Sequence, residues 1–401
     1  MQERDIKLLE NTAIRFVTRL DYYVMRELIS SGFVQKDSYP VMEDFLRIKK
    51  EASQAGFTEK TLSKLDDIIS SRSKVMDTVE KYADIIEKQR ISVLCKEDRD
   101  YPFSWKELSG MPPVFFAKGD TSILSGITHK GAVSIVGSRQ PGRYSLYATR
   151  EFSSKLSKKG VAVVSGMALG IDRAAHVASM EVGGKTVAVV PGGPDVIYPY
   201  KNADIYEKIC AQGVLITELP PGQEVLKQYF PSRNRLISAL SDACLVMEAG
   251  VYSGTLHMAS FAAAQSRDVF VLPNSIYVDN CLGGLMLLRD GAEVLIDVDT
   301  VYERIMEQVD NRRALLQGEV DDGNDLAALR ALARIAPENL SEEQWKLVIC
   351  DEISEKPRNI DELCFSLGIP FTYLSSMVTI LETEGRIAND QGKYVLTIHG
   401  R

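Results

Sequence analysis

The sequence predicts an α/β protein whose centre is a doubly wound parallel sheet. Between residues 130 and 297, short β-branched runs alternate with amphipathic helical stretches, as expected for parallel strands that are buried on both faces. Residues 1–85 show apolar side chains at helical spacing, and residues 341–397 have the pattern of three helices and a hairpin. These observations predict a sheet domain between two smaller domains.

The bulk composition excludes several classes of protein. The 401 residues carry a net charge of −8, with 45% hydrophobic and 25% charged residues, which is typical of a globular chain. No apolar run reaches transmembrane length and the N-terminus has no signal-peptide pattern, so we expect a cytoplasmic protein with no membrane partner. The six cysteines form no CxxC pair and the four histidines do not fall at ligand spacing with them, so we expect free thiols and no metal.

Four segments follow from this pattern. We expect an N-terminal helical domain of the SAM or helix-hairpin-helix type at residues 1–85 and the sheet domain at 86–308. An acidic linker is predicted at 309–340, and a winged-helix domain at 341–401. The sheet domain is expected to contain the strands Ala132–Val136, Val161–Val164, Thr186–Val190, Val214–Thr217, Ala243–Met247 and Val269–Leu272, with helices at Ser145–Lys158, Asp172–Val182 and Gly254–Ser266.

The predicted recognition helix of the winged-helix domain is poorly suited to DNA. It spans Phe371–Glu384, contains no lysine or arginine, and carries Glu382 and Glu384 at its end. A major-groove helix without a basic residue has little attraction for phosphate. We therefore expect this domain to be mainly a protein-interaction module.

Unusual loops are predicted at the carboxyl ends of the strands, where open parallel sheets bind their ligands. Glycines let backbone amides approach an anion closely, and helix N-termini add partial positive charge. Five such loops on one edge predict an anion site. They are Gly137-Ser138-Arg139, Ser165–Asp172, Pro191–Asp195 with Tyr198-Pro199, Phe230–Ser238 and Glu248–Thr255.

The loop Phe230–Ser238 is the most informative of the five. Pro231 disfavours helix at Phe230, and Ser232 is expected to cap the helix that follows. Guanidinium groups at a helix N-terminus suit phosphate, and a neighbouring ring can stack on a base. We expect Arg233 and Arg235 to divide two roles, one facing the site and one structural, and the sequence leaves open which is which.

Nucleotide cofactors are not indicated. Gly137–Gly142 has the spacing of a phosphate-binding Walker loop, but Arg143-Tyr144 stands where Lys-Ser/Thr is required. No GxGxxG motif follows the first predicted strand, so a dinucleotide is not expected either. We expect no cofactor.

The order of these motifs resembles that of the DprA/Smf family of bacterial DNA-processing proteins. The similarity extends over residues 90 to 297, where Pro112–Asp120 matches the segment that the family places before its sheet. The resemblance implies an extended Rossmann-like fold that binds single-stranded DNA without catalysis, forms a homodimer and hands the strand to a RecA-type recombinase. It also implies a role in natural transformation and recombination, in protecting incoming DNA.

The resemblance and the loops together predict a DNA-binding site, in which Arg139 occupies the position of a family arginine for phosphate. Phe230 either stacks a base or anchors its loop, and Asn234 either bonds backbone or contacts the ligand. The expected site residues are Gly137, Ser138, Arg139, Ser165, Gly166, Gly170, Gly192, Gly193, Phe230, Arg233, Asn234, Arg235, Ser253, Gly254 and Thr255.

Two departures from the family pattern affect the rim of this site. Pro273-Asn274 stands where the family has Pro-Gly, and Ser275–Cys281 is atypical. Some members also carry a basic residue where Leu169 stands.

The alternative is a nucleotide-processing enzyme that cleaves a base from its ribose phosphate on a related sheet. Those enzymes carry Pro-Gly-Gly-x-Gly-Thr-x-x-Glu, whereas Pro191-Gly192-Gly193 is not followed by Gly-Thr here, and Gly254-Thr255 has Met258 in place of the glutamate. Methionine cannot act as a general base. Asp172 and His176, four residues apart, form a conceivable acid and base pair. The favoured interpretation is that Asp172 caps the helix or bonds a loop amide and that His176 is a satisfied, partly buried histidine.

Overall fold

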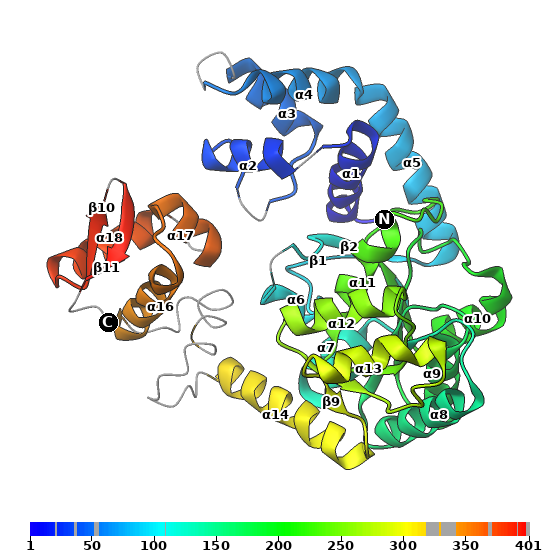
Figure 1. Ribbon diagram of the computed structural model, residues 1–401. Coiled ribbons are helices and arrows are strands. Elements are labelled where there is room, and N and C mark those ends of the chain that lie inside the picture. Colours follow the sequence, from blue (N-terminus) through cyan, green and yellow to red (C-terminus); the bar gives the residue numbers. More distant parts are fainter. Residues whose placement is uncertain are drawn as a thin grey trace. The chain divides into compact units, whose positions relative to one another are not determined.

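The computed structural model describes residues 1–20, 22–35, 38–51, 56–108, 110–317, 329, 342–367, 371–390 and 392–397 (Figure 1). These residues form two compact units. The first comprises Met1–Pro102 and Gly110–Ile305, and the second comprises Phe103–Ser109 and Met306–Arg401. The predicted acidic linker at 309–340 begins within a helix, and its residues 318–328 and 330–340 lie outside the described residues.

Five helices precede the sheet in the first unit. Their apolar faces meet in a core that includes Leu9, Ile14, Phe45 and Leu65 and continues to Phe116 in the sheet, so these helices and the sheet share one core. The domain boundary predicted at residue 85 falls inside the fifth of these helices. The helices are α1 (Glu3–Thr18), α2 (Tyr22–Ser30), α3 (Met42–Glu51), α4 (Glu59–Ser70) and α5 (Arg72–Gln89).

Within the described residues the sheet has nine strands in the order β1-β2-β6-β5-β4-β3-β7-β8-β9. The seven strands from β6 to β9 in this order are parallel, whereas β2 runs antiparallel to both β1 and β6. The strands are β1 (Ser92–Cys95), β2 (Val114–Gly119), β3 (Ala132–Gly137), β4 (Ala162–Ser165), β5 (Thr186–Val189), β6 (Val214–Thr217), β7 (Ala243–Glu248), β8 (Asp268–Val271) and β9 (Glu293–Val294).

The chain winds in opposite directions from the middle of this sheet. The path from β3 leads to β4 on one side, and the strands that follow β6 return to the other side of β3 as β7 and β8. Such a reversal opens a crevice at the carboxyl ends of the two central strands, where doubly wound proteins bind their ligands. The predicted doubly wound sheet is confirmed, and β3 and β7 flank its switch point.

Helices cover both faces of the sheet. On one face α8 packs against α9 and α9 against α10, and on the other α11 packs against α12 and α12 against α13 (Figure 1). These helices are α8 (Arg143–Lys158), α9 (Ile171–Glu181), α10 (Ala203–Gln212), α11 (Tyr229–Leu240), α12 (Gly254–Ala264) and α13 (Leu282–Arg289). The remaining elements of this region are α7 (Ser122–Lys130) and the short 3-10 helices η2 (Tyr200–Asn202) and η3 (Asp279–Cys281).

Two sequence-based expectations about this region need correction. The segment Pro112–Asp120, expected to precede the sheet, contains β2 and lies within it, where Phe115 and Phe116 are fully buried. The helix expected to begin after Pro231 begins at Tyr229 instead, and Ser232 does not cap it. Proline is tolerated in the first turn because its missing N–H has no intrahelical partner there.

The second unit has its own core around Trp345, Leu363, Leu374 and Leu381. Its C-terminal helices and hairpin follow the predicted order, although their classification as a winged helix remains a prediction. The elements of this unit are α6 (Phe103–Lys106), the end of α14 (Val298–Gln317), α16 (Glu342–Glu355), α17 (Ile360–Leu367), α18 (Phe371–Thr383), β10 (Ile387–Asp390) and β11 (Lys393–Leu396).

The described residues offer neither a membrane span nor a metal site of the usual kinds. No helix among them combines the length and the apolar character that crossing a bilayer requires. No cluster of three or more histidine, cysteine, aspartate or glutamate side chains in the same part of the chain is arranged to hold a metal ion.

Candidate functional site

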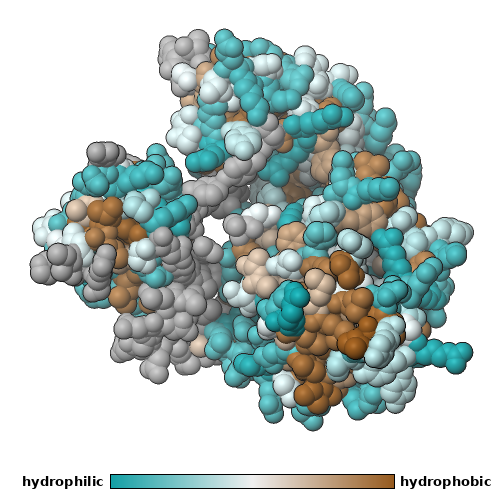
Figure 2. All heavy atoms as spheres, viewed as in Figure 1, coloured by the Kyte–Doolittle hydropathy of each residue, from teal (hydrophilic) through white to brown (hydrophobic). Residues whose placement is uncertain are grey.

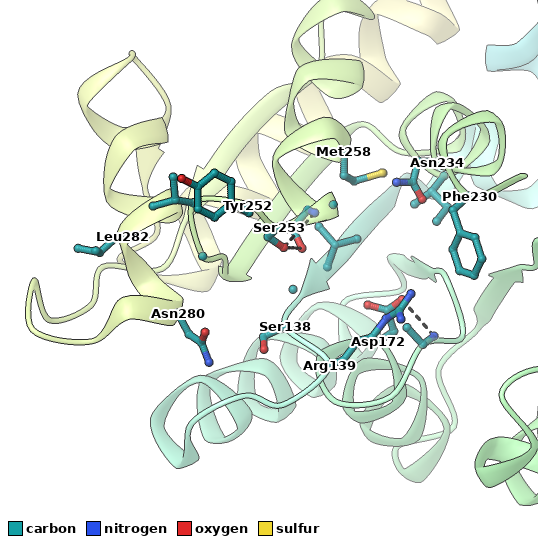
Figure 3. Close-up of a pocket in the computed structure, with 18 of the residues that line it drawn as sticks. Ser138, Arg139, Asp172, Phe230, Asn234, Tyr252, Ser253, Met258, Asn280 and Leu282 are labelled. Carbon is teal, nitrogen blue, oxygen red and sulfur yellow. Dashed lines mark hydrogen bonds between the residues drawn. The ribbon is translucent and has the colours of Figure 1, made fainter. Parts of the chain in front are cut away.

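A cavity of about 750 Å³ lies at the switch point between β3 and β7. This volume falls within the range of ordinary ligand pockets, which is roughly 300–1,000 Å³. Figure 3 shows Phe230, Asn234 and Arg139 at one end and Tyr252, Asn280 and Leu282 at the other. The lining comes from the end of β3 and the loops after β3, β4 and β7, from α11, from the starts of α9, α12 and α13, and from η3.

The first end of the cavity surrounds a partly exposed aromatic ring with positive charge. The Arg139 guanidinium carbon lies 5.5 Å from the centre of the Phe230 ring, and that of Arg233 lies 5.9 Å from it. Tyr198 meets the same ring edge to face, with 6.0 Å between ring centres. A cation over an aromatic face is attracted to the ring, so the Phe230 ring favours both guanidinium groups beside it.

The two arginines differ in how firmly they are held. Arg139 is exposed, whereas Arg233 is 6% exposed and its Nη1 donates to the carbonyls of Gly166 and Val189. Its Nε donates to Asn234 Oδ1 at 3.1 Å. Burial lowers the pKa of Arg233 to about 10, an effect that Asp172 opposes and Arg139 reinforces. Arg233 is therefore a charge fixed in the cavity wall, and Arg139 is an exposed charge at its rim.

Asp172 supports this wall from below. Its Oδ2 accepts from the amides of Gly166 and Ala168 at 3.1 and 3.2 Å, so it holds the loop after β4. Burial raises the pKa of the Asp172 carboxyl, while the charge of Arg233 and the two amides act in the opposite direction. This placement agrees with the interpretation of Asp172 as a carboxylate that bonds loop amides.

The second end of the cavity is built on a helix N-terminus. Ser253 caps α12, and its Oγ accepts from the Thr255 amide at 3.1 Å and donates to the Thr255 hydroxyl at 2.9 Å. The first turn of a helix has amides without intrahelical partners, and the helix dipole favours negative charge there. The arrangement can bind an anion beside a flat aromatic group.

Nine of the fifteen predicted site residues line the cavity together, from three segments that are far apart in the sequence. They are Gly137, Ser138, Arg139, Phe230, Arg233, Asn234, Ser253, Gly254 and Thr255.

Three predicted residues lie directly behind the cavity wall. Ser165 is fully buried and donates to the Ile135 carbonyl at 2.7 Å, within the sheet. A Cβ atom on Gly166 would lie 2.4 Å from Nη1 of Arg233, so glycine makes room for that guanidinium. Gly170 has a φ of +78°, and a Cβ atom added to it would lie 2.4 Å from the Ser138 carbonyl oxygen. These residues shape the wall without lining it.

Gly192 and Gly193 pack against the segment that follows β6 and not against the cavity. A Cβ atom on Gly192 would lie 2.7 Å from Val225 Cγ2, and one on Gly193 would lie 2.7 Å from the Pro220 carbonyl oxygen. The loop after β5 is therefore packed against the segment that follows β6, and neither glycine lines the cavity. A glycine in a sequence indicates that some group comes close to the backbone, but it does not distinguish a ligand from another part of the chain.

Arg235 has the structural role that the sequence left unassigned between the two arginines. Its Nη2 donates to Glu218, whose side chain is about as buried as its own, and it does not line the cavity. Burial raises the pKa of the Glu218 carboxyl, and the charge of Arg235 counteracts this. Arg233 faces the cavity instead.

His176 is not positioned to act with Asp172. It is fully buried, and its Nδ1 shares a hydrogen bond of 2.7 Å with Thr186 Oγ1, on the side of the adjacent strand. Burial, reinforced by the charge of Arg233, lowers the pKa of His176 to about 3. The histidine is neutral at physiological pH and belongs to the core between α9 and β5.

The lining also includes residues that sequence reasoning did not select, among them Tyr252, Asn280 and Leu282. Tyr252 stands in the Glu248–Thr255 loop but has no glycine or charge to mark it. Asn280 and Leu282 belong to the segment around Ser275–Cys281. Its departure from the family pattern was the one feature of the sequence that could have indicated a role for these residues in the site. Met258 lines the cavity as well, where the enzyme alternative requires a glutamate.

A doubly wound sheet with an anion-favouring cavity at its switch point defines a Rossmann-like ligand-binding protein. The chain belongs to the family described as DNA recombination-mediator protein A, whose model matches residues 92–306. The resemblance to the DprA/Smf family is thereby confirmed.

Individual relatives agree with this assignment. The chain is 33% identical over 314 residues to Protein Smf of Synechocystis sp., covering 75% of this chain and 78% of the relative. It is 34% identical over 222 residues to the DNA processing protein DprA of Bacillus subtilis, covering 55% and 73% of the two chains. Among solved structures, DNA processing protein A from Streptococcus pneumoniae matches with a TM-score of 0.53 and 28% identity, covering 71% of this chain and 98% of that one.

Proposed function

We propose that this protein binds single-stranded DNA in the cavity at the switch point, without catalysis, as a recombination mediator. The observation that carries the proposal is the cluster of Phe230 with the guanidinium groups of Arg139 and Arg233, opposite the N-terminus of α12. Phosphate is attracted to the guanidiniums and the helix end, and a base has a ring on which to stack.

The net negative charge of the chain implies that DNA is attracted by a local cluster of basic residues. With a net charge of −8, the surface as a whole repels nucleic acid, so attraction must come from a few gathered cations. Arg139 and Arg233 stand at the wall of a concave site, where low-dielectric walls strengthen their field. Contacts of this kind go to phosphates and ring faces, so sequence preference should be weak.

A single strand fits this site better than a duplex does. Bases in a duplex are paired and stacked within the helix, so a ring such as Phe230 in a cavity wall cannot reach their faces. A flexible strand can place a base in the cavity and its phosphates against the rim. Affinity should therefore fall when the same sequence is presented as a duplex.

The absence of catalysis is part of the proposal. The Asp172 carboxylate is engaged with two loop amides, and His176 faces Thr186 in the core. Met258 stands in the cavity wall at the position that a base-cleaving enzyme fills with glutamate. Asp172 does line the cavity, but its bonds to these amides and the absence of a partner base beside it argue against the enzyme alternative within the described residues.

A homodimer and a RecA-type recombinase are the proposed partners, with a role in protecting incoming DNA during natural transformation in the cytoplasm. Figure 2 shows apolar residues gathered over the region of α12 and α13. Met286 on α13 is 38% exposed, and Val294 in β9 and Ile296 just after it are 45% and 79% exposed. Exposed apolar patches of this kind mark protein interfaces, which supports a protein partner on this face. Dimerisation would place two cavities on one strand and raise avidity.

The C-terminal unit is proposed to contact protein rather than DNA. The segment of α18, Phe371–Thr383, contains no lysine or arginine, and the glutamate that follows it, Glu384, pairs with Lys346. This unit, expected to be a winged helix, therefore offers little attraction to phosphate.

Two measurements test the proposed function. Binding of a labelled oligo-dT strand and of a duplex of equal length should be compared over a range of salt concentrations, and we expect clear preference for the single strand. Equal affinity would move the assignment to a duplex-binding role. Incubation with nucleoside monophosphates should release no free base, and release that disappears in Asp172→Asn would support the enzyme instead.

A further inference from the structure

Three tyrosines with exposed rings extend from the second end of the cavity. Tyr252 is 102% exposed, Tyr277 is 90% exposed and Tyr144 is 52% exposed. Large aromatic rings are costly to leave in water and are enriched where a protein binds a partner. Tyr252 itself lines the cavity, so this surface is continuous with the proposed DNA site.

We propose that a DNA strand leaving the cavity continues over Tyr252, Tyr277 and Tyr144, and that successive bases stack on these rings. We call these three residues the aromatic track. The inference rests on the proposed function, because it extends the path of the same strand. It adds a second binding site with a defined ligand, the unpaired bases of single-stranded DNA that lie outside the cavity.

The loops that carry the track are joined to one another. The Gly142 amide, at the start of α8, donates to Glu248 Oε2 at the end of β7 over 2.9 Å. Gly250 in the loop after β7 packs against Asn280: a Cβ atom added to Gly250 would lie 3.6 Å from the Asn280 Cα. These contacts place the loops after β3, β7 and β8 around one opening.

A further bond joins the loop that carries Tyr277 to the start of α8. Asn274 Nδ2 donates to Ser145 Oγ at 3.4 Å, and Tyr144 is the residue before Ser145. The loop then turns on its own side chains, because the Ser275 amide donates to Asn274 Oδ1 and the Tyr277 amide donates to Ser275 Oγ. The turn holds the backbone of Tyr277 while its ring stays in solvent.

Charge along the opening suits a strand with its phosphates on one side. Arg139 and Arg143 are exposed, and within the described residues neither forms an ion pair. Asp279 is the acidic residue of the η3 segment on the other side. The phosphates are therefore expected to follow the two arginines, which leaves the bases to face the tyrosines. Aromatic platforms beside a cationic path are the usual construction of single-strand-binding surfaces.

The experiment compares two lengths of oligo-dT, about 4 and about 16 nucleotides, the range that single-strand-binding folds occupy. The shorter strand occupies the cavity, and the longer one also reaches the track. Tyr144→Ala with Tyr277→Ala removes two rings of the track that do not line the cavity. This pair should weaken binding of the longer strand by roughly tenfold or more and change binding of the shorter strand much less, because one stacked base contributes about 1.4 kcal/mol, equivalent to tenfold. The Tyr144→Phe and Tyr277→Phe pair keeps both rings and should bind as the wild type does.

Two controls separate stacking from other effects. Tyr23 is 69% exposed on α2, in the N-terminal helices, so Tyr23→Ala tests the loss of an exposed tyrosine elsewhere. A longer strand whose outer nucleotides lack bases should lose the length advantage in the wild type and show no further loss in the tyrosine variants.

A spectroscopic readout tests contact directly. The chain has two tryptophans, Trp105 and Trp345, and both are buried. A tryptophan at position 277 in Tyr277→Trp would therefore be the exposed reporter, and its fluorescence should be quenched by the longer strand but not by the shorter one.

The outcomes distinguish the two proposals. If the wild type binds neither strand, the proposed function fails and the track fails with it. If it binds both lengths equally and the alanine pair matches Tyr23→Ala, the cavity binds DNA and the track is wrong. If the alanine pair alters the mass of the protein in light scattering without altering DNA binding, the rings belong to an interface between copies of the chain, which also overturns the proposal.

Discussion

Replacing Arg139 by alanine tests whether the cavity holds phosphate. The Arg139 guanidinium is exposed at the rim, lies 5.5 Å from the Phe230 ring, and forms no ion pair with the rest of the described chain. Removing it should therefore take away one phosphate contact while leaving the fold intact. Arg233→Ala is a less clean test, because it would leave two carbonyls and Asp172 without their buried partner.

The size of the effect follows from counterion release. Each phosphate contact to a single strand contributes about 0.7 to the slope of log affinity against log salt. Arg139→Ala should lower the slope by about 0.7, so between roughly 50 and 200 mM salt the variant loses about 2.6-fold less affinity than the wild type. At low salt the variant should bind roughly tenfold or more weakly, because a charge-assisted hydrogen bond contributes about 1.5–3 kcal/mol.

Fluorescence anisotropy of a labelled oligo-dT strand, measured at several salt concentrations, gives both quantities. Arg47→Ala is the matched control, since Arg47 is an exposed arginine on α3. A slope for Arg139→Ala equal to that of the wild type, or an equal change in Arg47→Ala, would refute the phosphate assignment.

Three further predictions concern the residues that support the site. Arg235→Ala should destabilise the protein by about 2 kcal/mol in urea denaturation, because Glu218 stays behind unpaired, while the salt slope of DNA binding stays unchanged; a reduced slope would place Arg235 on the DNA. Burial holds His176 neutral in the folded protein, so the unfolded chain binds a proton on this residue more readily. The free energy of unfolding should therefore fall by about 1.4 kcal/mol per pH unit as the pH decreases from 6.5 towards 3. His176→Gln should show a shallower fall over the same range, and a pH profile identical to that of the wild type would contradict the burial argument. Gly170→Ala should lower stability by about 1–3 kcal/mol, because its φ of +78° and its contact with the Ser138 carbonyl leave no room for a Cβ atom, and an unchanged melting temperature would show that the loop adapts.

The central sheet was predictable because its signal is local and repeated. Buried strands such as Ala243–Glu248 are continuous apolar runs, and the helices between them have a regular apolar face. The added strands β1 and β2 were missed, since β2 joins the sheet by antiparallel pairing with β6 across about a hundred residues and β1 joins it only through β2. Pairing between distant segments leaves no local pattern in the sequence.

The site was predictable where its chemistry is marked by residue type, as at Arg139 and Ser253. The sequence could not show that Gly192 and Gly193 approach the segment after β6 rather than a ligand, because glycine marks close contact of either kind. It also could not separate the roles of Arg233 and Arg235, two positions apart on one helix. The pairing of Arg235 with Glu218, which lies 17 residues earlier, decides between them.

Photo-crosslinking followed by peptide mapping tests the location of bound DNA most directly. An oligo-dT strand carrying photoreactive thymines should form adducts on peptides that contain Phe230 and Tyr252, at the two ends of the cavity between β3 and β7. Excess duplex of the same sequence should compete poorly for these adducts. Adducts confined to the C-terminal helices α16 to α18 or to the N-terminal helices α1 to α5 would contradict the account.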